Sequence, residues 1–206
     1  MKKLLSLLQP VNLAVVLNRC GWCGDDADYQ RYHDDEWAVP VFDDRLLFEM
    51  LILEGAQAGL NWLTILRKRE HYRQAFDYFD PHQIAAYDEK KFQQLKNNSG
   101  IVRHSQKIHS AINNAQCYLI LCQQKNSFSD YLWDFVDHKP IQNHWHELKD
   151  IPTTTPLSKA LSKDLKQRGF SFVGPTITYA FMQAVGLVND HLTICHRHPS
   201  HNAFDR

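Results

Sequence analysis

Apolar residues recur at helical spacing through most of the chain after residue 40, and this pattern limits the possible folds more than any other feature. It is clear in residues 43–59, where apolar side chains follow Asp43, a candidate N-cap, along one helical face. Strict alternation of apolar and polar residues, which indicates a half-buried strand, is absent from the sequence. We therefore expect an all-α fold without a β-sheet.

Capping residues indicate where several helices begin and end. Pro156 follows Thr155, a candidate N-cap, and Pro175 opens a later apolar run; proline suits the first helical position because its nitrogen needs no acceptor. Gly169 closes the run that starts at Thr155. Residues 138–155 show no periodicity, so we expect a long connection there. The expected helical segments are 43–59, 61–79, 88–97, 105–124, 127–136, 155–169 and 175–190, with a short helix opened by Pro81.

The N-terminal residues match a secretion signal only in part. MKKLLSLLQPVNLAVVLNRC has two lysines, an apolar run and a cysteine, as bacterial lipoprotein signals do. Pro10 and Asn12 interrupt the run, and Arg19 occupies a position that usually carries a small residue. No other stretch approaches the roughly 18 apolar residues of a membrane span. The cysteine count of five is odd and favours a reducing compartment, so we expect a cytoplasmic protein without a membrane partner.

The formal charge is balanced, with 23 basic and 23 acidic residues. Nucleic-acid-binding proteins often carry a clear basic excess. The balance therefore argues against strong non-specific DNA binding, although it allows a basic face that is offset by acids elsewhere in the chain.

Residues 95–108, LKNNSGIVRHSQKI, form a candidate helical hairpin. Gly100 lies between two helical patterns, and Arg103 and Lys107 come early in the second. Free backbone N–H groups at a helix N-terminus suit a phosphate, and nearby cations add attraction. An ordinary helix–turn–helix with a glycine C-cap and a solvated basic face explains the same residues, and for the hairpin taken alone it is the favoured interpretation.

Cysteine and histidine occur in pairs near both ends of the chain. His191 and Cys195 are four residues apart, a spacing that places both on one side of a helical turn. Cys20, Cys23 and His33 provide further nitrogen and sulfur ligands near the other end. Structural zinc takes four such ligands in a tetrahedron. Buried free thiols are also common, so these residues alone do not decide between a metal site and free cysteines.

The stretch LEGAQAGLNW, residues 53–62, places one carboxylate among apolar neighbours. Glu54 is the only acid from residue 50 to residue 69, and Gly59 and Trp62 follow it closely. A helix with a glycine end and a core tryptophan would account for this pattern. A ligand site would account for it as well, because a charged residue is seldom fully buried without a partner.

The blocks RCGW, YHDDEWAVP, LEGAQAGLNW, GIVRH, FVGPT and FMQAVGLVNDH resemble, in order and spacing, bacterial 3-methyladenine DNA glycosylase I. The likeness extends from Arg19 to Cys195, and the combination is much more specific than any single block. It implies a helix-hairpin-helix DNA glycosylase fold in which a structural zinc joins the N- and C-terminal segments. The implied zinc ligands are Cys20, His33, His191 and Cys195, with His33 rather than Cys23 in the set.

The resemblance also implies a function. A monomeric enzyme would flip 3-methyladenine out of alkylated double-stranded DNA and hydrolyse its N-glycosidic bond, leaving an abasic site. Glu54 would contact the damaged base, and we infer from its position that Leu60 is a wedge that fills the gap in the duplex. The implied base pocket is formed by Trp22, Tyr29, Tyr32 and Trp62, and the implied DNA contacts of the hairpin are Gly100, Val102, Arg103 and Lys107, with a monovalent cation as a further expectation there.

The sequence departs from the family pattern in three places. Ala38 replaces the usual glycine of EWGVP, so the turn there must adjust, and Ser171 replaces a lysine that often precedes FVG. Residues 1–18 have no counterpart, and their role is open. We expect this extension, a single helical glycosylase domain over 19–200 and a tail over 201–206.

The distribution of acids bears on mechanism. No Asp or Glu lies between Glu89 and Asp130, so the hairpin is not followed closely by the aspartate that many related glycosylases use. Methylation at N3 makes adenine a cationic and therefore good leaving group, which reduces the need for acid–base help. Two other classes remain possible at this point: a hydrolase with a catalytic zinc, which needs an open coordination position, and a DNA-binding module without enzymatic activity.

Overall fold

A computed structural model describes residues 17–204, so the expected extension over 1–18 lies almost entirely outside the described residues. The described chain is mostly helical, which confirms the expectation drawn from periodicity. The first helix, within residues 19–40, was not expected. The α-helices are α1 (Ala27–Asp35), α2 (Asp44–Gln57), α3 (Trp62–Ala75), α4 (Pro81–Ala85), α5 (Glu89–Asn97), α6 (Ser105–Gln124), α7 (Phe128–Trp133), α8 (Pro156–Gln167) and α9 (Pro175–Ala184), joined by short 3₁₀ turns at Gly21–Cys23, Asp77–Phe79, Asp134–Val136, Leu148–Asp150 and Pro199–Phe204.

The expected caps are present at the helix ends. The Asp43 carboxylate accepts the N–H of Leu46 at 2.8 Å and begins α2. The Thr155 hydroxyl accepts the N–H of Ser158 at 3.0 Å and begins α8. Each contact satisfies a backbone donor that has no partner within its own helix.

The expectation of no sheet is wrong. Strand β1 (Ile141–Gln142) pairs in parallel with β2 (Val188–Asn189), with Ile141 opposite Val188. Two residues per strand are too few to show alternation in a sequence, which is why periodicity missed them. The same pairing shortens the last expected helix, since α9 ends at Ala184 and the chain then turns into β2.

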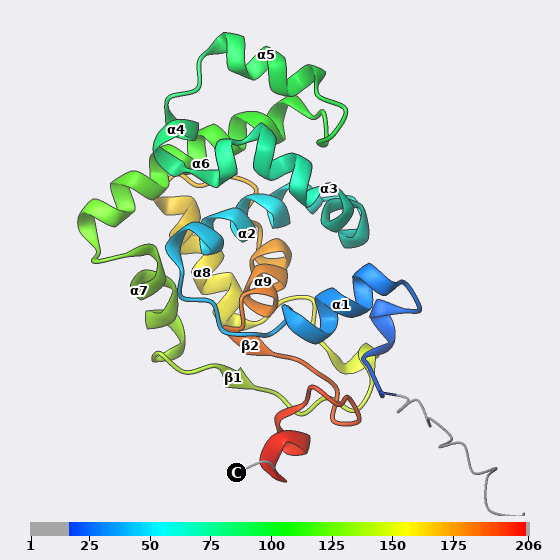
Figure 1. The fold of residues 1–206 in the computed structure, drawn as a ribbon. Coiled ribbons are helices and arrows are strands. Elements are labelled where there is room, and N and C mark those ends of the chain that lie inside the picture. Colours follow the sequence, from blue (N-terminus) through cyan, green and yellow to red (C-terminus); the bar gives the residue numbers. More distant parts are fainter. Residues whose placement is uncertain (1–16, 205–206) are drawn as a thin grey trace, which may run out of the picture.

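Helix α2 is the centre of the molecule. Its residues from Leu47 to Ala56 are all buried, and it contacts α3, α6, α7 and α9. In Figure 1, α3 to α6 lie on one side of α2, and α1, β1, β2 and both ends of the described chain lie on the other. Glu54, the one acid in the second half of α2, therefore lies in the interior.

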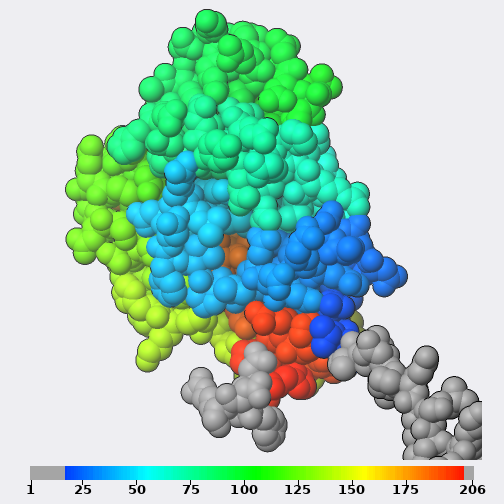
Figure 2. Space-filling view, viewed as in Figure 1, coloured from blue at the N-terminus to red at the C-terminus, as the bar shows by residue number. Residues whose placement is uncertain are grey.

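The two ends of the described chain meet. Figure 2 shows the red C-terminal segment against the blue N-terminal segment on one face of the molecule. Two hydrogen bonds join them, because Asn18 O accepts the N–H of His196 at 2.8 Å and also lies 2.9 Å from His196 Nδ1. This contact brings together the cysteine and histidine residues of both ends.

The turn after α1 is strained at the position where the family usually has glycine. Ala38 has φ 62°, in the left-handed region that residues with a Cβ adopt at a cost. Opposite it, Gly186 has φ 73°, and a Cβ added there would lie 2.4 Å from Val39 C and Pro40 N. The end of α9 and the turn after α1 therefore approach too closely for a side chain at residue 186.

Candidate active site and metal centre

Glu54 is a buried acid without a cationic partner among the described residues. Its side chain lies in the second half of α2, and the residue is 3% exposed. Burial alone raises the pKa of its carboxyl group to about 8. Glu49, on the same helix, is buried to a similar extent but pairs with Arg73 at 2.8 Å. The fold thus pairs Glu49 with a cation and leaves Glu54 without one among the described residues.

Aromatic rings from three segments pack against one another next to α2. Tyr32 of α1 lies 5.4 Å from Trp62 of α3, centroid to centroid, and 6.3 Å from Trp22. Trp22 and Tyr29 form an edge contact at 4.9 Å. Burial raises the pKa of Tyr32, and the negative charge of Glu54 raises it further. We call Glu54, Trp22, Tyr29, Tyr32 and Trp62 the Glu54 cluster.

Polar atoms of the Glu54 cluster have no hydrogen-bond partner. Of four such buried side-chain atoms among the described residues, three are Glu54 Oε2, Trp22 Nε1 and Trp62 Nε1. An unpartnered buried polar group is costly and calls for an explanation, such as a missing ligand. Two N–H donors, one carboxylate and several aromatic faces together suit a flat, cationic heteroaromatic ring.

The residues after α2 form a tight turn that exposes Leu60. Ala58 has φ −43° and ψ 118°, Gly59 has φ 74°, and Leu60 N donates to Gln57 O at 2.6 Å. These values define a type II β-turn, which requires positive φ at its third residue and so favours glycine. Leu60 is 44% exposed beside the Glu54 cluster, which is the position that a wedge would need.

Helices α5 and α6 form the expected hairpin, but two of its backbone donors already have acceptors. Gly100 N donates to Asn98 Oδ1 at 2.8 Å, and Val102 N donates to Tyr72 Oη at 3.0 Å. A Cβ at Gly100 would lie 2.9 Å from His71 Cβ, so close packing against α3 explains the glycine. The structure therefore gives Gly100 a packing role in addition to any contact with phosphate.

A basic groove lies between the hairpin and α3. It has a volume of about 620 Å³, and no acidic residue lines it. Lys68 of α3 donates to Ser99 O at 2.9 Å and joins the two walls. Arg67 and Lys68 were not among the expected site residues, although the run RKR in α3 could have indicated them. The lining residues are Thr64, Arg67, Lys68, His71, Asn98, Ser99 and Gly100.

The two cations expected near the start of α6 have different surroundings. Arg103 is exposed. Lys107 is half-buried, its Nζ donates to Ala56 O and Ala58 O at 2.7 Å each, and burial lowers its pKa. Lys107 is thus bound to the end of α2 and the turn after it, rather than pointing freely outward.

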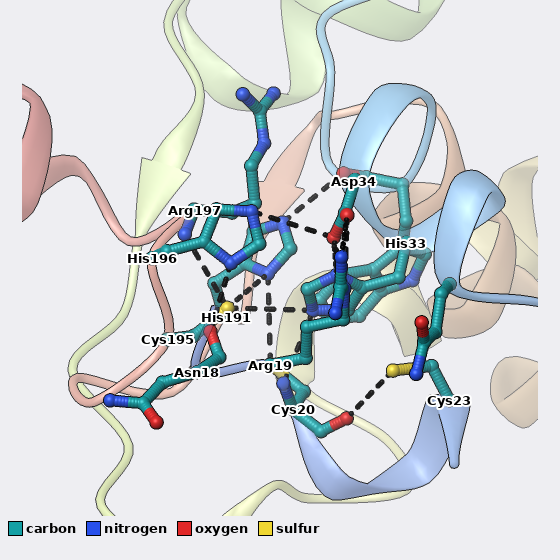
Figure 3. A network of polar contacts seen from close by, with 12 residues as sticks. Asn18, Arg19, Cys20, Cys23, His33, Asp34, His191, Cys195, His196 and Arg197 are labelled. Atoms are coloured by element: carbon teal, nitrogen blue, oxygen red, sulfur yellow. Dashed lines mark hydrogen bonds and ion pairs between the residues drawn. The ribbon is translucent and has the colours of Figure 1, made fainter. Parts of the chain in front are cut away.

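Cys20, His33, His191 and Cys195 form a second buried group, which we call the Cys–His cluster. All four are buried, and their ligand atoms lie within 4.8 Å of one another, so they can hold a metal ion. Cys195 Sγ lies 3.4 Å from His33 Nε2 and 3.5 Å from His191 Nδ1 (Figure 3). Cys23 is outside the group, with its thiol donating to Cys20 O at 3.1 Å.

One expectation about this cluster is wrong. His191 and Cys195 are not on a helix, because β2 precedes them and a turn carries them, with Cys195 N donating to Leu192 O at 2.8 Å. The turn still brings the two side chains together. Backbone N–H groups of Leu192 and Arg197 point at the sulfurs of Cys20 and Cys195, each at 3.4 Å, which favours thiolates.

Charged groups support the Cys–His cluster from outside. Asp34 Oδ1 lies 2.7 Å from His33 Nδ1, and Arg19 binds the same carboxylate through two nitrogens (Figure 3). Against the effect of burial, these hydrogen bonds lower the pKa of Asp34. The neighbouring Cys20 side chain and then, against the effect of burial, His191 and His33 lower the pKa of the Cys195 thiol. Asp34 was not among the expected site residues, and its place next to His33 in the sequence was the only indication.

Taken together, these features define a helical protein with a buried site that suits a planar cationic ring, beside a basic groove. Among the described residues, no helix is both long and apolar enough to cross a membrane.

Comparison with known proteins agrees with this class. A profile of the methyladenine glycosylase family matches residues 22–198. The chain is 51% identical to DNA-3-methyladenine glycosylase 1 of Escherichia coli (strain K12), over 89% of this chain and 98% of the relative. A crystal structure of 3-methyladenine DNA glycosylase I is 53% identical, with a TM-score of 0.86, over 88% of this chain and all (100%) of the other. A variant of 3-methyladenine DNA glycosylase I, solved in complex with 3-methyladenine, is 39% identical, with a TM-score of 0.84, over 87% and 96%.

The chain therefore belongs to the methyladenine glycosylase family.

Proposed function

We propose that this protein is a DNA repair glycosylase that excises 3-methyladenine from alkylated double-stranded DNA by hydrolysis, leaving an abasic site. The observation that carries the proposal is the set of unpartnered atoms in the Glu54 cluster, namely one carboxylate oxygen and two indole N–H groups. The relatives at about half identity are named for this activity, and a family structure contains 3-methyladenine. Trp22, Tyr29, Tyr32 and Trp62 form the pocket, and Glu54 contacts the base.

Charge explains both selection and bond breaking. A cationic base gains up to about 2 kcal/mol from aromatic faces when desolvated. It also supplies the charge partner that Glu54 lacks, and a neutral adenine supplies neither. When the N-glycosidic bond breaks, its electron pair neutralises the base, and water adds to the sugar carbon and loses a proton. Because the leaving group starts as a cation, no acid is needed to protonate it.

The DNA itself would be bound by the hairpin and the basic groove. We propose that α5 and α6 form the helix-hairpin-helix element, that Gly100, Val102 and Arg103 lie at the phosphate backbone, and that Leu60 fills the gap left by the flipped base. A monovalent cation at the hairpin remains a prediction. The exposed Arg103 and the lack of acids along the groove support this arrangement.

We further propose that the metal of the Cys–His cluster is zinc. Zinc bonds of about 2.3 Å to sulfur and about 2.05 Å to nitrogen require sulfur–nitrogen edges of roughly 3.5 Å in a tetrahedron. The observed edges of 3.4, 3.5 and 3.6 Å fit this value. When bound, zinc would supply structural cross-linking. Four protein ligands leave no open position, which argues against a catalytic zinc.

The remaining assignments are a cytoplasmic monomer and a single glycosylase domain over 19–200, with an extension over 1–18 and a tail over 201–206. The activity is tested by incubating the protein with methylated duplex DNA and identifying the released bases. Release of 3-methyladenine by the wild-type protein, strongly reduced in Glu54→Gln, is expected. DNA binding without base release would support the non-enzymatic class instead.

A further inference from the structure

We propose that Lys107 is a positioning residue that holds the Gln57–Leu60 turn in the conformation that presents Leu60 to DNA. The inference rests on the proposed glycosylase function. Its basis is one contact: Lys107 Nζ, near the start of α6, donates to Ala56 O and Ala58 O at 2.7 Å each. One side chain of the hairpin thus grips both the end of the Glu54 helix and the turn that follows it.

The bond to Ala58 O selects the type of turn. Type I and type II turns differ mainly by a flip of the central peptide, here Ala58–Gly59, whose carbonyl is Ala58 O. The observed angles, ψ 118° at Ala58 and φ 74° at Gly59, are those of type II. A flip would point this carbonyl away from Lys107 and leave a half-buried ammonium with one acceptor fewer, which is costly.

The bond to Ala56 O fixes the end of α2. Ala56 carries one of the last four carbonyls of α2. These carbonyls have no N–H donor within the helix, and they carry partial negative charge. A lysine ammonium satisfies this carbonyl and favours the helix end. The contact lies two residues beyond Glu54, so it also fixes the distance between the carboxylate and the turn.

Packing does little else to hold the turn. Leu60 is 44% exposed, and a Cβ added at Gly59 would meet no atom within 4 Å. The Leu60 N–H to Gln57 O bond is compatible with both turn types. The orientation of Leu60 therefore depends on Lys107, which belongs to the same helix start as the exposed Arg103.

The competing interpretation is that Lys107 contacts a DNA phosphate. The two roles predict different salt behaviour, because losing a phosphate contact lowers the slope of log affinity against log salt by about 1. Losing a positioning residue leaves the slope unchanged and instead weakens the preference for a duplex with a gap.

The test compares affinities for an intact duplex and for the same duplex with one tetrahydrofuran abasic site. In Lys107→Met, we expect the preference for the abasic duplex to fall about 10-fold with an unchanged salt slope. Lys107→Arg should restore most of the preference. Leu60→Ala should lower the preference for the abasic duplex at least as much as Lys107→Met does. The variant that carries both substitutions should lower this preference no more than Leu60→Ala alone. Arg103→Met, the phosphate control, should reduce the slope and keep the preference.

A second variant protects the test against a folding defect in Lys107→Met. Gly59→Ala leaves Lys107 intact but disfavours positive φ in the turn, and it should lower the same preference by about 5-fold. The proposal would be overturned if Lys107→Met lost affinity equally for both duplexes and showed a smaller salt slope. It would also be overturned if the double variant lost preference for the abasic duplex by the product of the two single fold-changes. Failure of the wild-type protein to release 3-methyladenine would refute the proposed function separately, since the binding ratios still decide the role of Lys107.

Discussion

The Glu54 cluster and the Cys–His cluster are both buried groups of polar side chains, yet their polar atoms are satisfied in opposite ways. In the Cys–His cluster, sulfurs and imidazoles contact one another at 3.4–3.6 Å, and the second ring nitrogen of His33 is hydrogen-bonded to Asp34. In the Glu54 cluster, a carboxylate oxygen and two indole nitrogens have no partner. The first group is satisfied by contacts among its own members and can hold a metal ion. The second is complementary to a ring that must enter and leave.

The two clusters share a wall. Tyr32 and His33 are neighbours in α1, and Trp22 follows Cys20 by two residues, with its ring 5.3 Å from that of His33. The Cys–His cluster thus packs directly behind one wall of the proposed base pocket. The comparison teaches that a buried polar group which satisfies itself stabilises the fold, while one left unsatisfied costs stability and binds a ligand.

Removing the proposed zinc should produce the largest effect, because it would break the cross-link between the two ends of the described chain. Cys195→Ser, or treatment with a chelator, should lower the free energy of unfolding by at least about 3 kcal/mol. Elemental analysis should give about one metal ion per wild-type chain and much less in the variant. Cys23→Ser is the matched control and should keep its metal and most of its stability. Full metal content in Cys195→Ser would remove Cys195 from the ligand set.

Glu54→Gln should show the opposite behaviour, with weaker binding but greater stability. Burial raises the pKa of Glu54 from 4.5 to about 8, so the folded state binds its proton more tightly than the unfolded state does. The resulting stability is complete below pH 4.5 and is lost as the pH rises towards 8. The variant should escape this loss and be more stable than wild type, on the order of 3 kcal/mol at pH 7. Denaturant unfolding at several pH values measures the difference.

The same variant should lose base affinity. A charge-assisted hydrogen bond is worth roughly 1.5–3 kcal/mol, so binding of 3-methyladenine should weaken by about 10- to 150-fold. Glu49→Gln is the matched control on the same helix, because its partner is Arg73; it should destabilise the protein and leave base binding unchanged. Unchanged affinity with collapsed single-turnover excision in Glu54→Gln would instead make Glu54 a catalytic base.

Asp34→Asn should act on the metal without unfolding the protein. A carboxylate that accepts from a ligating histidine fixes the ring, and its loss typically costs 10- to 100-fold in metal affinity. Chelator competition measures this change, and Asp35→Asn, an exposed neighbour, is the control. Equal effects of the two substitutions would mean that the Asp34–His33 contact does not support the metal.

Ala38→Gly should have the smallest effect and tests whether stability can rise without loss of binding. Relief of the positive φ should stabilise the protein by about 0.5–1 kcal/mol, with base affinity unchanged, in contrast to Glu54→Gln. Ala86, with φ −95°, is the control, and its substitution by glycine should destabilise. A destabilised Ala38→Gly would show that the methyl group contributes more in the core than the strain costs.

The helices could be predicted from the sequence because each carries enough turns for its period and its caps to be visible, as in α6 and α8. The two-residue strands and the turn after β2 could not, since neither is long enough to show a period. Spacing indicated the cysteine and histidine residues of the Cys–His cluster in pairs, but the choice of His33 over Cys23 came from resemblance. The contacts of Lys107 with Ala56 O and Ala58 O could not be predicted from the sequence, because they depend on where two helix ends meet in space.

The joining of the chain ends also sets the order in which the protein can mature during synthesis. The N-terminal residues leave the ribosome first, and domains begin to fold as they emerge. Cys20 and His33 must nevertheless wait for their partners until α9, β2 and the turn carrying His191 and Cys195 have been made. A nascent chain stopped after α9 would have Glu54 in place but one wall of its pocket unanchored. Translation that ends early should therefore yield fragments that cannot capture bases, so an incomplete enzyme would not generate abasic sites in the genome.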